Sequence, residues 1–209
     1  MFTELVAAVL GVPAERVLLD TEAPICATLM GNGVVGSRTT MQFGSAFKLG
    51  ALEVVKKGRS LAARKLEAAE DDIEFAAGEY RVKGTDRRVS LLALVDGARG
   101  AGGHPLDADA EVALGRAFPS GAHVAEVEID PETGTTQIVN YAAVDDFGTI
   151  INPMIVEGQV HGGIVQGVGQ ALLEGAVYDS EGQLASGSYM DYTMPRADNV
   201  PSFKVETIV

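Results

Sequence analysis

The chain has 209 residues, of which 46% are hydrophobic and 22% charged, a balance typical of a folded globular protein rather than a disordered one. Its net charge of −13 disfavours a nucleic-acid partner, because nucleic-acid binding relies on a basic surface. The single cysteine, Cys26, excludes an internal disulfide and a cysteine cluster for zinc or an iron–sulfur centre. The sequence shows neither a signal peptide nor an apolar run of about 18 residues, so we expect a cytoplasmic protein without a transmembrane segment.

The first third of the sequence is predicted to be mainly helical. Apolar residues recur at helical spacing over residues 2–10, and a Gly-x-Pro sequence ends that pattern at Gly11. Residues 16–20 (RVLLD) are a candidate for a short strand. After a loop, Ser37 is predicted to cap a long helix that runs to about residue 69, with a kink or a break near Gly58.

The later segments alternate hairpins with helices, which indicates an α+β fold. The predicted elements are hairpins at 72–83 and 123–144, a short helix capped by Ser90, a helix at 157–174, and a terminal hairpin that turns at 178–182. We predict two subdomains, residues 1–120 with the long helix and the first hairpin, and residues 121–209 with the hairpin at 123–144, the helix at 157–174 and the terminal hairpin.

A glycine-rich loop, Gly31 to Thr39 (GNGVVGSRT), precedes the long helix. Its G-x-G-x-x-G pattern matches a dinucleotide fingerprint, but the strand candidate ends well before it, whereas a NAD- or FAD-binding unit needs a strand directly before the first glycine. A loop that leads into a helix N-terminus also exposes backbone N–H groups to a phosphate or another anion, with side-chain donors from Ser37, Arg38 and Thr39. The alternative is a flexible loop followed by an ordinary capped helix.

A second segment, residues 158–170 (GQVHGGIVQGVGQ), combines glycines with glutamines. Gly163 and Gly167 lie four positions apart, so a helix here has a strip without side chains where backbone or ligand can approach. The amides of Gln159, Gln166 and Gln170 donate and accept hydrogen bonds, which suits a polar heterocycle better than a metal ion. The alternative is close helix packing with the glutamines in solvent.

Acidic residues offer a third candidate site. Asp145 and Asp146 are adjacent, and Asp191 lies in the sequence Tyr189-Met190-Asp191-Tyr192. Paired carboxylates can act in acid–base or metal chemistry, but most adjacent aspartates in turns bind solvent or nearby backbone N–H groups. The three histidines have no metal-site spacing, and Cys26 is expected to be structural. We therefore assign no catalytic residue and no metal ligand.

Several stretches, taken in order, resemble the molybdopterin-binding large subunit of the xanthine dehydrogenase/aldehyde oxidase family, in its carbon monoxide dehydrogenase-like branch. They are ELVAAVLGVPAERVLL, GSRTTMQFGSAF, LAARKLEAAEDDIEFAAGEYRVKGT, AHVAEVEIDPETGTTQIVNYAAVDDFGTIINPMIVEGQVHGGIVQGVGQALLE and YMDYTMPRADNVP. The resemblance covers nearly the whole chain and is weakest around residues 20–32 and 97–120. It implies that both subdomains belong to a molybdopterin-binding domain of the aldehyde oxidase type.

The resemblance implies a cofactor, namely molybdopterin extended by cytosine dinucleotide, whose own dithiolene sulfurs hold molybdenum. Gly36, Ser37, Arg38 and Thr39 would contact its pterin and pyrophosphate, and Gln159 would bind the pterin. The family performs oxidative hydroxylation of an aldehyde, an N-heterocycle or a CO-like substrate. The implied partners are the remainder of the large subunit and the subunits that carry [2Fe–2S] centres and FAD, in a dimer of heterotrimers.

The sequence departs from the family pattern in what it does not contain. The family's catalytic glutamate lies in a Gly-Val-Gly-Glu segment beyond the region that matches residues 195–209, and the substrate loop belongs to the upstream half. We therefore expect the isolated chain to be inactive. A non-catalytic binding or structural domain with this fold is one alternative, and a NAD- or FAD-binding module is another.

Overall fold

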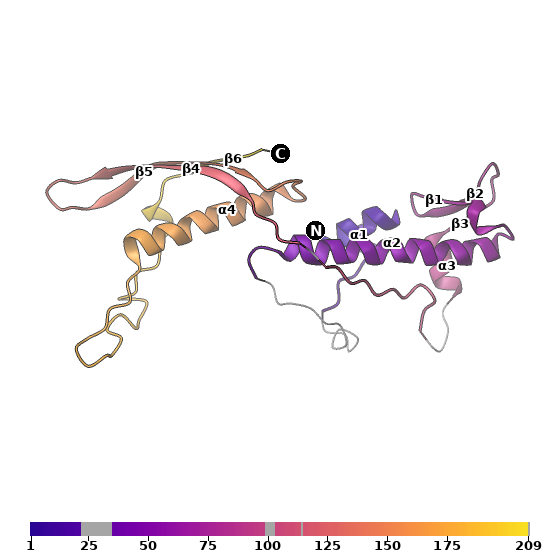
Figure 1. Ribbon diagram of the computed structural model, residues 1–209, viewed down its shortest axis with the longest axis horizontal. Coiled ribbons are helices and arrows are strands. Elements are labelled where there is room, and N and C mark those ends of the chain that lie inside the picture. Colours follow the sequence, from indigo (N-terminus) through magenta and orange to yellow (C-terminus); the bar gives the residue numbers. More distant parts are fainter. Residues whose placement is uncertain (22–34, 99–102, 114, 209) are drawn as a thin grey trace. The chain divides into compact units, whose positions relative to one another are not determined.

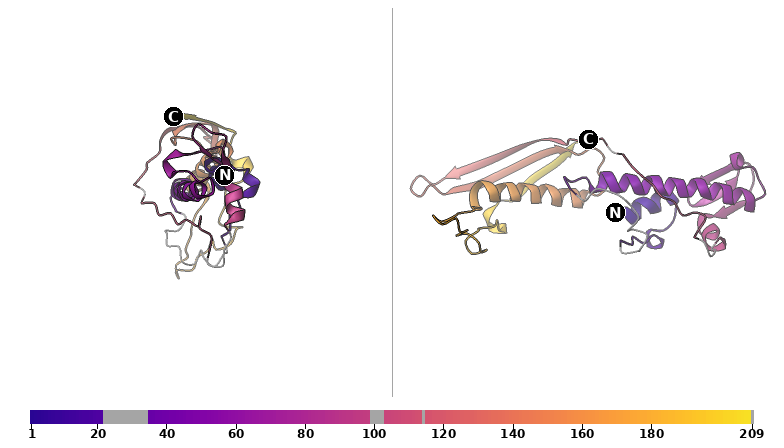
Figure 2. Two further views of the ribbon diagram at one scale, coloured as in Figure 1. Left: turned by 90° about the vertical axis from the view of Figure 1, so that its right-hand side faces the viewer. Right: turned by 60° about the horizontal axis from the view of Figure 1, so that its bottom comes forward.

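The computed structural model describes residues 1–21, 35–98, 103–113 and 115–208. The chain divides into two compact units, Met1–Arg116 and Ala117–Val209. Each unit combines a long helix with a three-stranded sheet, as Figure 1 and Figure 2 show. The predicted α+β class is confirmed.

Unit 1 begins with helix α1 (Phe2–Leu10), which ends as predicted at Gly11, a residue in the left-handed conformation with φ 61°. The segment that follows contradicts the strand predicted at residues 16–20. Ala14–Arg16 form a 3₁₀ turn (η1), and the next residues do not form a strand. The side chain of Leu18 is 90% exposed, so the apolar run that suggested a strand is not part of the core.

Helix α2 (Thr39–Lys65) is the longest element. It differs from the prediction at the expected cap, Ser37, and at the expected break, Gly58. Ser37 does not cap it, because Arg38 holds the N-cap position and Ser37 adopts a left-handed conformation. The helix also continues without a break through Gly58. A Cβ added at Gly58 would collide with the hydroxyl of Tyr80, which is fully buried and donates to the Val55 carbonyl at 3.0 Å. Gly58 therefore permits close packing and does not end the helix.

The sheet of unit 1 pairs β1 (Ile73–Ala76), β2 (Glu79–Val82) and β3 (Arg88–Ser90) in that order, all antiparallel. The first two strands are the predicted hairpin, and β3 was not predicted. Ser90 then caps α3 (Leu91–Gly97) as expected, since its hydroxyl accepts from the Ala93 N–H. The core of the unit is formed by Ala62, Ala63, Ile73, Tyr80, Val82, Val89, Leu91, Leu94 and Leu106.

Unit 2 is built on the predicted hairpin, observed as β4 (Ser120–Ile129) and β5 (Thr136–Asp146). Its turn is held by Asp130, whose carboxylate accepts from the N–H groups of Glu132 and Thr133; these bonds lower the pKa of Asp130. The register shifts between Glu126 and Val127, which leaves Val139 of β5 as a bulge. β6 (Phe203–Ile208) completes the sheet by pairing parallel to β5, an arrangement the sequence did not predict.

Helix α4 (Pro153–Val168) packs on one face of this sheet. It begins earlier than predicted, because the side chain of Asn152 caps it by accepting from the Ile155 N–H. Its core contacts are made by Ile138, Ala143, Val160, Ile164 and Val168, with Phe203 and Val205 alongside. A π-helical turn, η4 (Gly169–Leu173), follows it. The predicted terminal hairpin is reduced to one bridge between Tyr178 and Leu184, and a 3₁₀ turn, η5 (Ala197–Asn199), precedes β6.

Candidate functional site

The predicted site residues fall in both units, with Gly36, Ser37, Arg38 and Thr39 at the start of α2 and Gln159 in α4. Gly36 and Ser37 both have left-handed backbones, with φ 60° and 56°, and Arg38 follows with φ −92°. Ser37 is strained in this conformation by roughly 1–2 kcal/mol, because its Cβ crowds the backbone. The turn is exposed, and Arg38 Nε donates to the Val35 carbonyl across it at 3.3 Å.

This turn leaves the N-terminus of α2 without a side-chain cap. The first intrahelical bond runs from the Gln42 N–H to the Arg38 carbonyl at 2.8 Å, so the N–H groups of Thr39, Thr40 and Met41 precede it. The positive end of the helix dipole and successive N–H groups in a turn of this kind favour an anion. The alternative of an ordinary helix start capped by Ser37 is therefore not observed.

The first half of the glycine-rich loop, including Gly31 and Gly33, lies outside the described residues, as does Cys26. The NAD or FAD interpretation would need a strand before that loop. The preceding described segment, residues 17–20, is not a strand, so the observed structure gives this interpretation no support.

The second candidate surface is the exposed face of α4. Gln159, Gln166 and Gln170 are all exposed. Within the described part of the chain, a Cβ added at Gly158, Gly162, Gly163 or Gly167 would meet no heavy atom within 4 Å. The helix packing that could have explained these glycines is therefore not made by the described residues, and the glutamine face is open to a ligand or to another polypeptide.

His161, two residues from Gln159, turns toward the sheet. Its ring packs edge-on against Phe203 with 5.4 Å between ring centroids, and its Nε2 atom is buried without a hydrogen-bond partner among the described residues. Its contact with Phe203 places it behind α4, on the side away from the open glutamine face.

A polar network in the sheet was missed at the sequence level. His123 Nε2 lies 3.0 Å from Asp145 Oδ1, and His123 Nδ1 lies 3.2 Å from the Tyr141 hydroxyl. The Asp145 carboxylate requires a proton on Nε2, so in the neutral imidazole Nδ1 accepts from Tyr141. Asp145 is only 7% exposed, and a Cβ at Gly121 would collide with its carboxylate. The network fastens β4 to β5, and Tyr141 continues it through ring contact with Phe203.

The other acidic candidates have structural partners. Asp146 accepts from the Gly148 N–H at 2.9 Å, which is the local turn bond that adjacent aspartates commonly make, and Asp191 accepts from the Ser188 hydroxyl at 2.6 Å. Across the described ranges, no group of three or more His, Cys, Asp and Glu side chains could hold a metal ion. No helix in those same ranges is long and apolar enough to cross a membrane.

A family model described as a molybdopterin cofactor-binding domain matches residues 1–201. The chain is 39% identical to the 6-hydroxypseudooxynicotine dehydrogenase complex subunit gamma of Paenarthrobacter nicotinovorans, over 82% of this chain and 22% of that protein. It is 33% identical to the carbon monoxide dehydrogenase large chain of Hydrogenophaga pseudoflava, over 100% of this chain and 26% of that protein.

Solved structures show the same likeness. The crystal structure of the Cu,Mo-CO dehydrogenase in its carbon monoxide reduced state matches with a TM-score of 0.83 and 30% identity, covering 100% of this chain and 27% of that chain. The chain thus spans about a quarter of the length of the proteins that it matches.

Proposed function

Because the chain belongs to the family of molybdopterin cofactor-binding domains, we propose that it helps to hold a molybdopterin cytosine dinucleotide in a molybdenum hydroxylase large subunit. The family membership confirms the resemblance seen in the sequence. The observation that carries the proposal is the uncapped, exposed N-terminus of α2, which Gly36 and Ser37 enter in left-handed conformations. A pyrophosphate is the part of the cofactor that such a site suits, because it is a compact anion.

The residues of the turn have distinct proposed roles. The N–H groups that follow Arg38 donate to phosphate oxygens, and the Thr39 and Ser37 hydroxyls add donors. The Arg38 guanidinium supplies a positive charge whose planar donors match a phosphate. Gly36 lets the backbone approach the ligand, because it has no side chain and adopts φ 60° without strain. The turn therefore binds and orients an anion.

On α4, the proposed role of Gln159 is to bind the pterin ring through its amide. The open positions at Gly162 and Gly163 support this role, because a flat heterocycle can approach the helix closely there. When bound, the cofactor supplies the oxidative hydroxylation chemistry for an aldehyde, an N-heterocycle or a CO-like substrate. We assign no catalytic residue and no metal ligand to this chain.

The proposal also includes partner subunits and a cellular location. By name, the relatives are a large chain and a subunit of a dehydrogenase complex, which supports assembly with other subunits. We propose that these partners carry [2Fe–2S] centres and FAD in a dimer of heterotrimers, and that the complex lies in the cytoplasm. The competing function is a domain that keeps this fold and binds no cofactor.

Cytidine diphosphate is a direct probe, because it presents the cytidine and pyrophosphate of the proposed cofactor. In a titration of the 209-residue chain followed by amide NMR, we expect the signals of residues 37–41 to shift. Ser37→Glu should weaken this binding at least tenfold by placing a negative charge beside the phosphates. Arg87→Gln, which removes an exposed arginine elsewhere in unit 1, should change the affinity less than twofold.

Two outcomes would contradict the proposal. Absence of any shift at residues 37–41 would favour the domain without a cofactor. Tighter binding of NAD or FAD than of cytidine diphosphate would favour the dinucleotide-binding alternative.

A further inference from the structure

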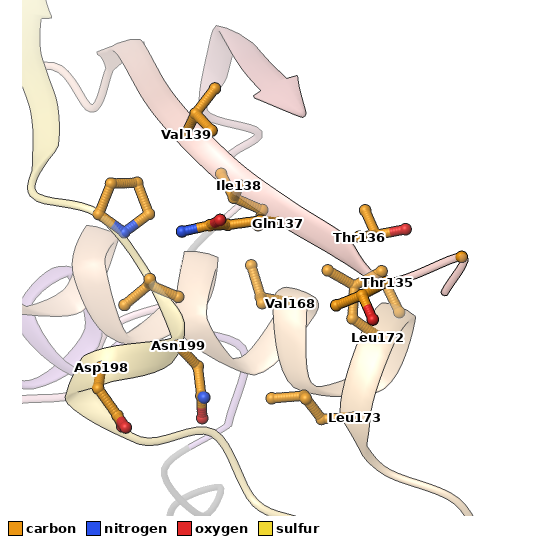
Figure 3. Close-up of a pocket in the computed structure, with 14 residues that line it drawn as sticks. Thr135, Thr136, Gln137, Ile138, Val139, Val168, Leu172, Leu173, Asp198 and Asn199 are labelled. Carbon is orange, nitrogen blue, oxygen red and sulfur yellow. The ribbon is translucent and has the colours of Figure 1, made fainter. Parts of the chain in front are cut away.

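Unit 2 contains a groove whose lining includes neither Gln159 nor the residues of the His123 network. Its volume is about 780 Å³. Figure 3 shows its two long walls, with Gln137, Ile138 and Val139 of β5 on one side and Leu172 and Leu173 of η4 on the other, while Asn199 lies at the end toward β6. The groove is lined by apolar side chains, among them Val168, Leu172 and Leu173, and by polar ones, among them Gln137 and Asn199.

One wall of the groove is an unpaired strand edge. β5 pairs with β6 only from Tyr141 to Asp146, whereas Thr136, Gln137 and Ile138 pair only with β4 in the described part of the chain. The bulge at Val139 separates the two halves of β5. Backbone N–H and C=O groups at an open edge are ready partners for another strand. The groove therefore offers hydrogen bonds along its length as well as apolar contact.

The opposite wall has an unusual and well-fixed backbone. The π-helical turn is closed by a bond from the Glu174 N–H to the Gly169 carbonyl at 2.8 Å. A Cβ at Gly169 would come within 2.7 Å of Pro195 Cγ, and the Glu174 carboxylate accepts from the Tyr192 hydroxyl at 3.0 Å, a bond that raises the pKa of Tyr192. The turn stands at the C-terminal end of α4, where single turns of this kind occur. Here the turn holds Leu172 in the groove with 43% of its surface exposed.

We propose that this groove binds an extended polypeptide segment, contributed by the part of a molybdenum hydroxylase large subunit that lies outside the quarter matched by this chain. An extended segment can satisfy the open β5 edge and cover Leu172 at the same time, as in recognition by strand addition. A small apolar molecule would leave the backbone groups of β5 unpaired. The matched carbon monoxide dehydrogenase chain has nearly three quarters of its length outside the match. The occupant that we propose is a segment from this unmatched part of such a subunit.

The inference rests on the proposed function for the identity of the occupant, and its test needs no cofactor. Twelve-residue peptides that tile the Hydrogenophaga pseudoflava large chain outside the matched region are titrated into the 209-residue chain by fluorescence anisotropy. We expect at least one peptide to bind with a micromolar Kd. In hydrogen exchange, that peptide should protect the amides of residues 136–139.

Three variants locate the binding. Leu172→Glu should weaken peptide binding at least tenfold, because it places a charge where the peptide would cover an exposed apolar side chain. Val139→Asp, at a second exposed position in the groove, should weaken it similarly. Leu184→Glu is the matched control, since Leu184 is a leucine of unit 2 with 47% exposure that does not line the groove, and it should change the Kd less than twofold. Far-UV circular dichroism checks that each variant is folded.

Several results would overturn the proposal. These are binding by none of the tiled peptides, binding that the two groove variants leave unchanged, and a groove closed by a second copy of the chain, seen as a dimer that Leu172→Glu dissociates. Displacement of the peptide by a fatty acid at lower concentration would likewise assign the groove to a small apolar ligand. Failure of the cytidine diphosphate titration with intact peptide binding would reject the cofactor site and leave strand binding standing.

Discussion

The two long helices use their glycines in opposite ways. In α2, Gly58 receives the buried hydroxyl of Tyr80, so the missing side chain is replaced by a group from the sheet of the same unit. In α4, Gly162 and Gly163 face open space in the described structure. A helix loses stability at every interior glycine relative to alanine, by about 0.8–1 kcal/mol. The first helix recovers this loss by packing inside the unit, whereas the described residues leave the glycine positions of the second uncovered.

The strongest test of this contrast is Gly58→Ala. Its added methyl group collides with Tyr80 in a packed core, so we expect the free energy of unfolding to fall by about 3 kcal/mol. Gly50→Ala, in the same helix, is the matched control, because its Cβ would lie 3.6 Å from Ala110 Cβ in ordinary contact. Urea unfolding followed by far-UV circular dichroism measures both. A Gly58→Ala variant as stable as Gly50→Ala would show that Gly58 has no special packing role.

A second test concerns the tyrosine that fills the Gly58 position. Burial raises the pKa of Tyr80 to about 12, against a smaller opposite effect of the Arg59 charge, whereas an unfolded tyrosine titrates at 10.0. The unfolded chain therefore loses this proton first as the pH rises. Stability that depends on neutral Tyr80 is complete below pH 10 and is lost progressively between pH 10 and about 12.

Tyr80→Phe separates this effect from the other groups that titrate in alkali. At pH 7 the variant should be less stable by about 1 kcal/mol, because the Val55 carbonyl loses its hydrogen bond. From pH 10 to 12 the wild type should lose about 2 kcal/mol more stability than the variant, since each unit of pKa shift corresponds to about 1.4 kcal/mol. Parallel stability curves for the two proteins across this pH range would contradict the buried neutral hydroxyl.

These glycines also show which features of the fold could be predicted from the sequence. Periodicity predicted the helices and the α+β class, because apolar spacing directly reflects which face is buried. It could not distinguish a glycine that breaks a helix from one that admits a tyrosine, since Tyr80 reaches Gly58 only after β2 has folded onto α2. The same limit applies to β6, whose parallel pairing to β5 depends on a partner far away in sequence.

At the candidate site, too, only part of the structure could be predicted from the sequence. The anion-binding interpretation of Gly36 to Thr39 used only local features, yet the cap assigned to Ser37 was wrong, because the left-handed pair moves the start of the helix to Thr39. The His123–Asp145 pair escaped notice for a different reason. Without the bulge at Val139, His123 would pair with Ala142, and Asp145 would lie on the other face of the sheet. No local pattern predicted that bulge.

The smallest effect on stability is expected at an uncovered glycine of α4. Gly163→Ala places a methyl group in open space on α4, so we expect it to raise the free energy of unfolding by about 0.5–1 kcal/mol, the reverse in sign of Gly58→Ala. Gly163 lies one helical turn after Gln159, on the same face. Under the proposed function, the molybdenum content of an assembled large subunit should therefore fall in the variant while its stability rises. A variant that is both more stable and fully loaded with molybdenum would separate the open glycine face from cofactor binding, and Gln159 would then need another partner.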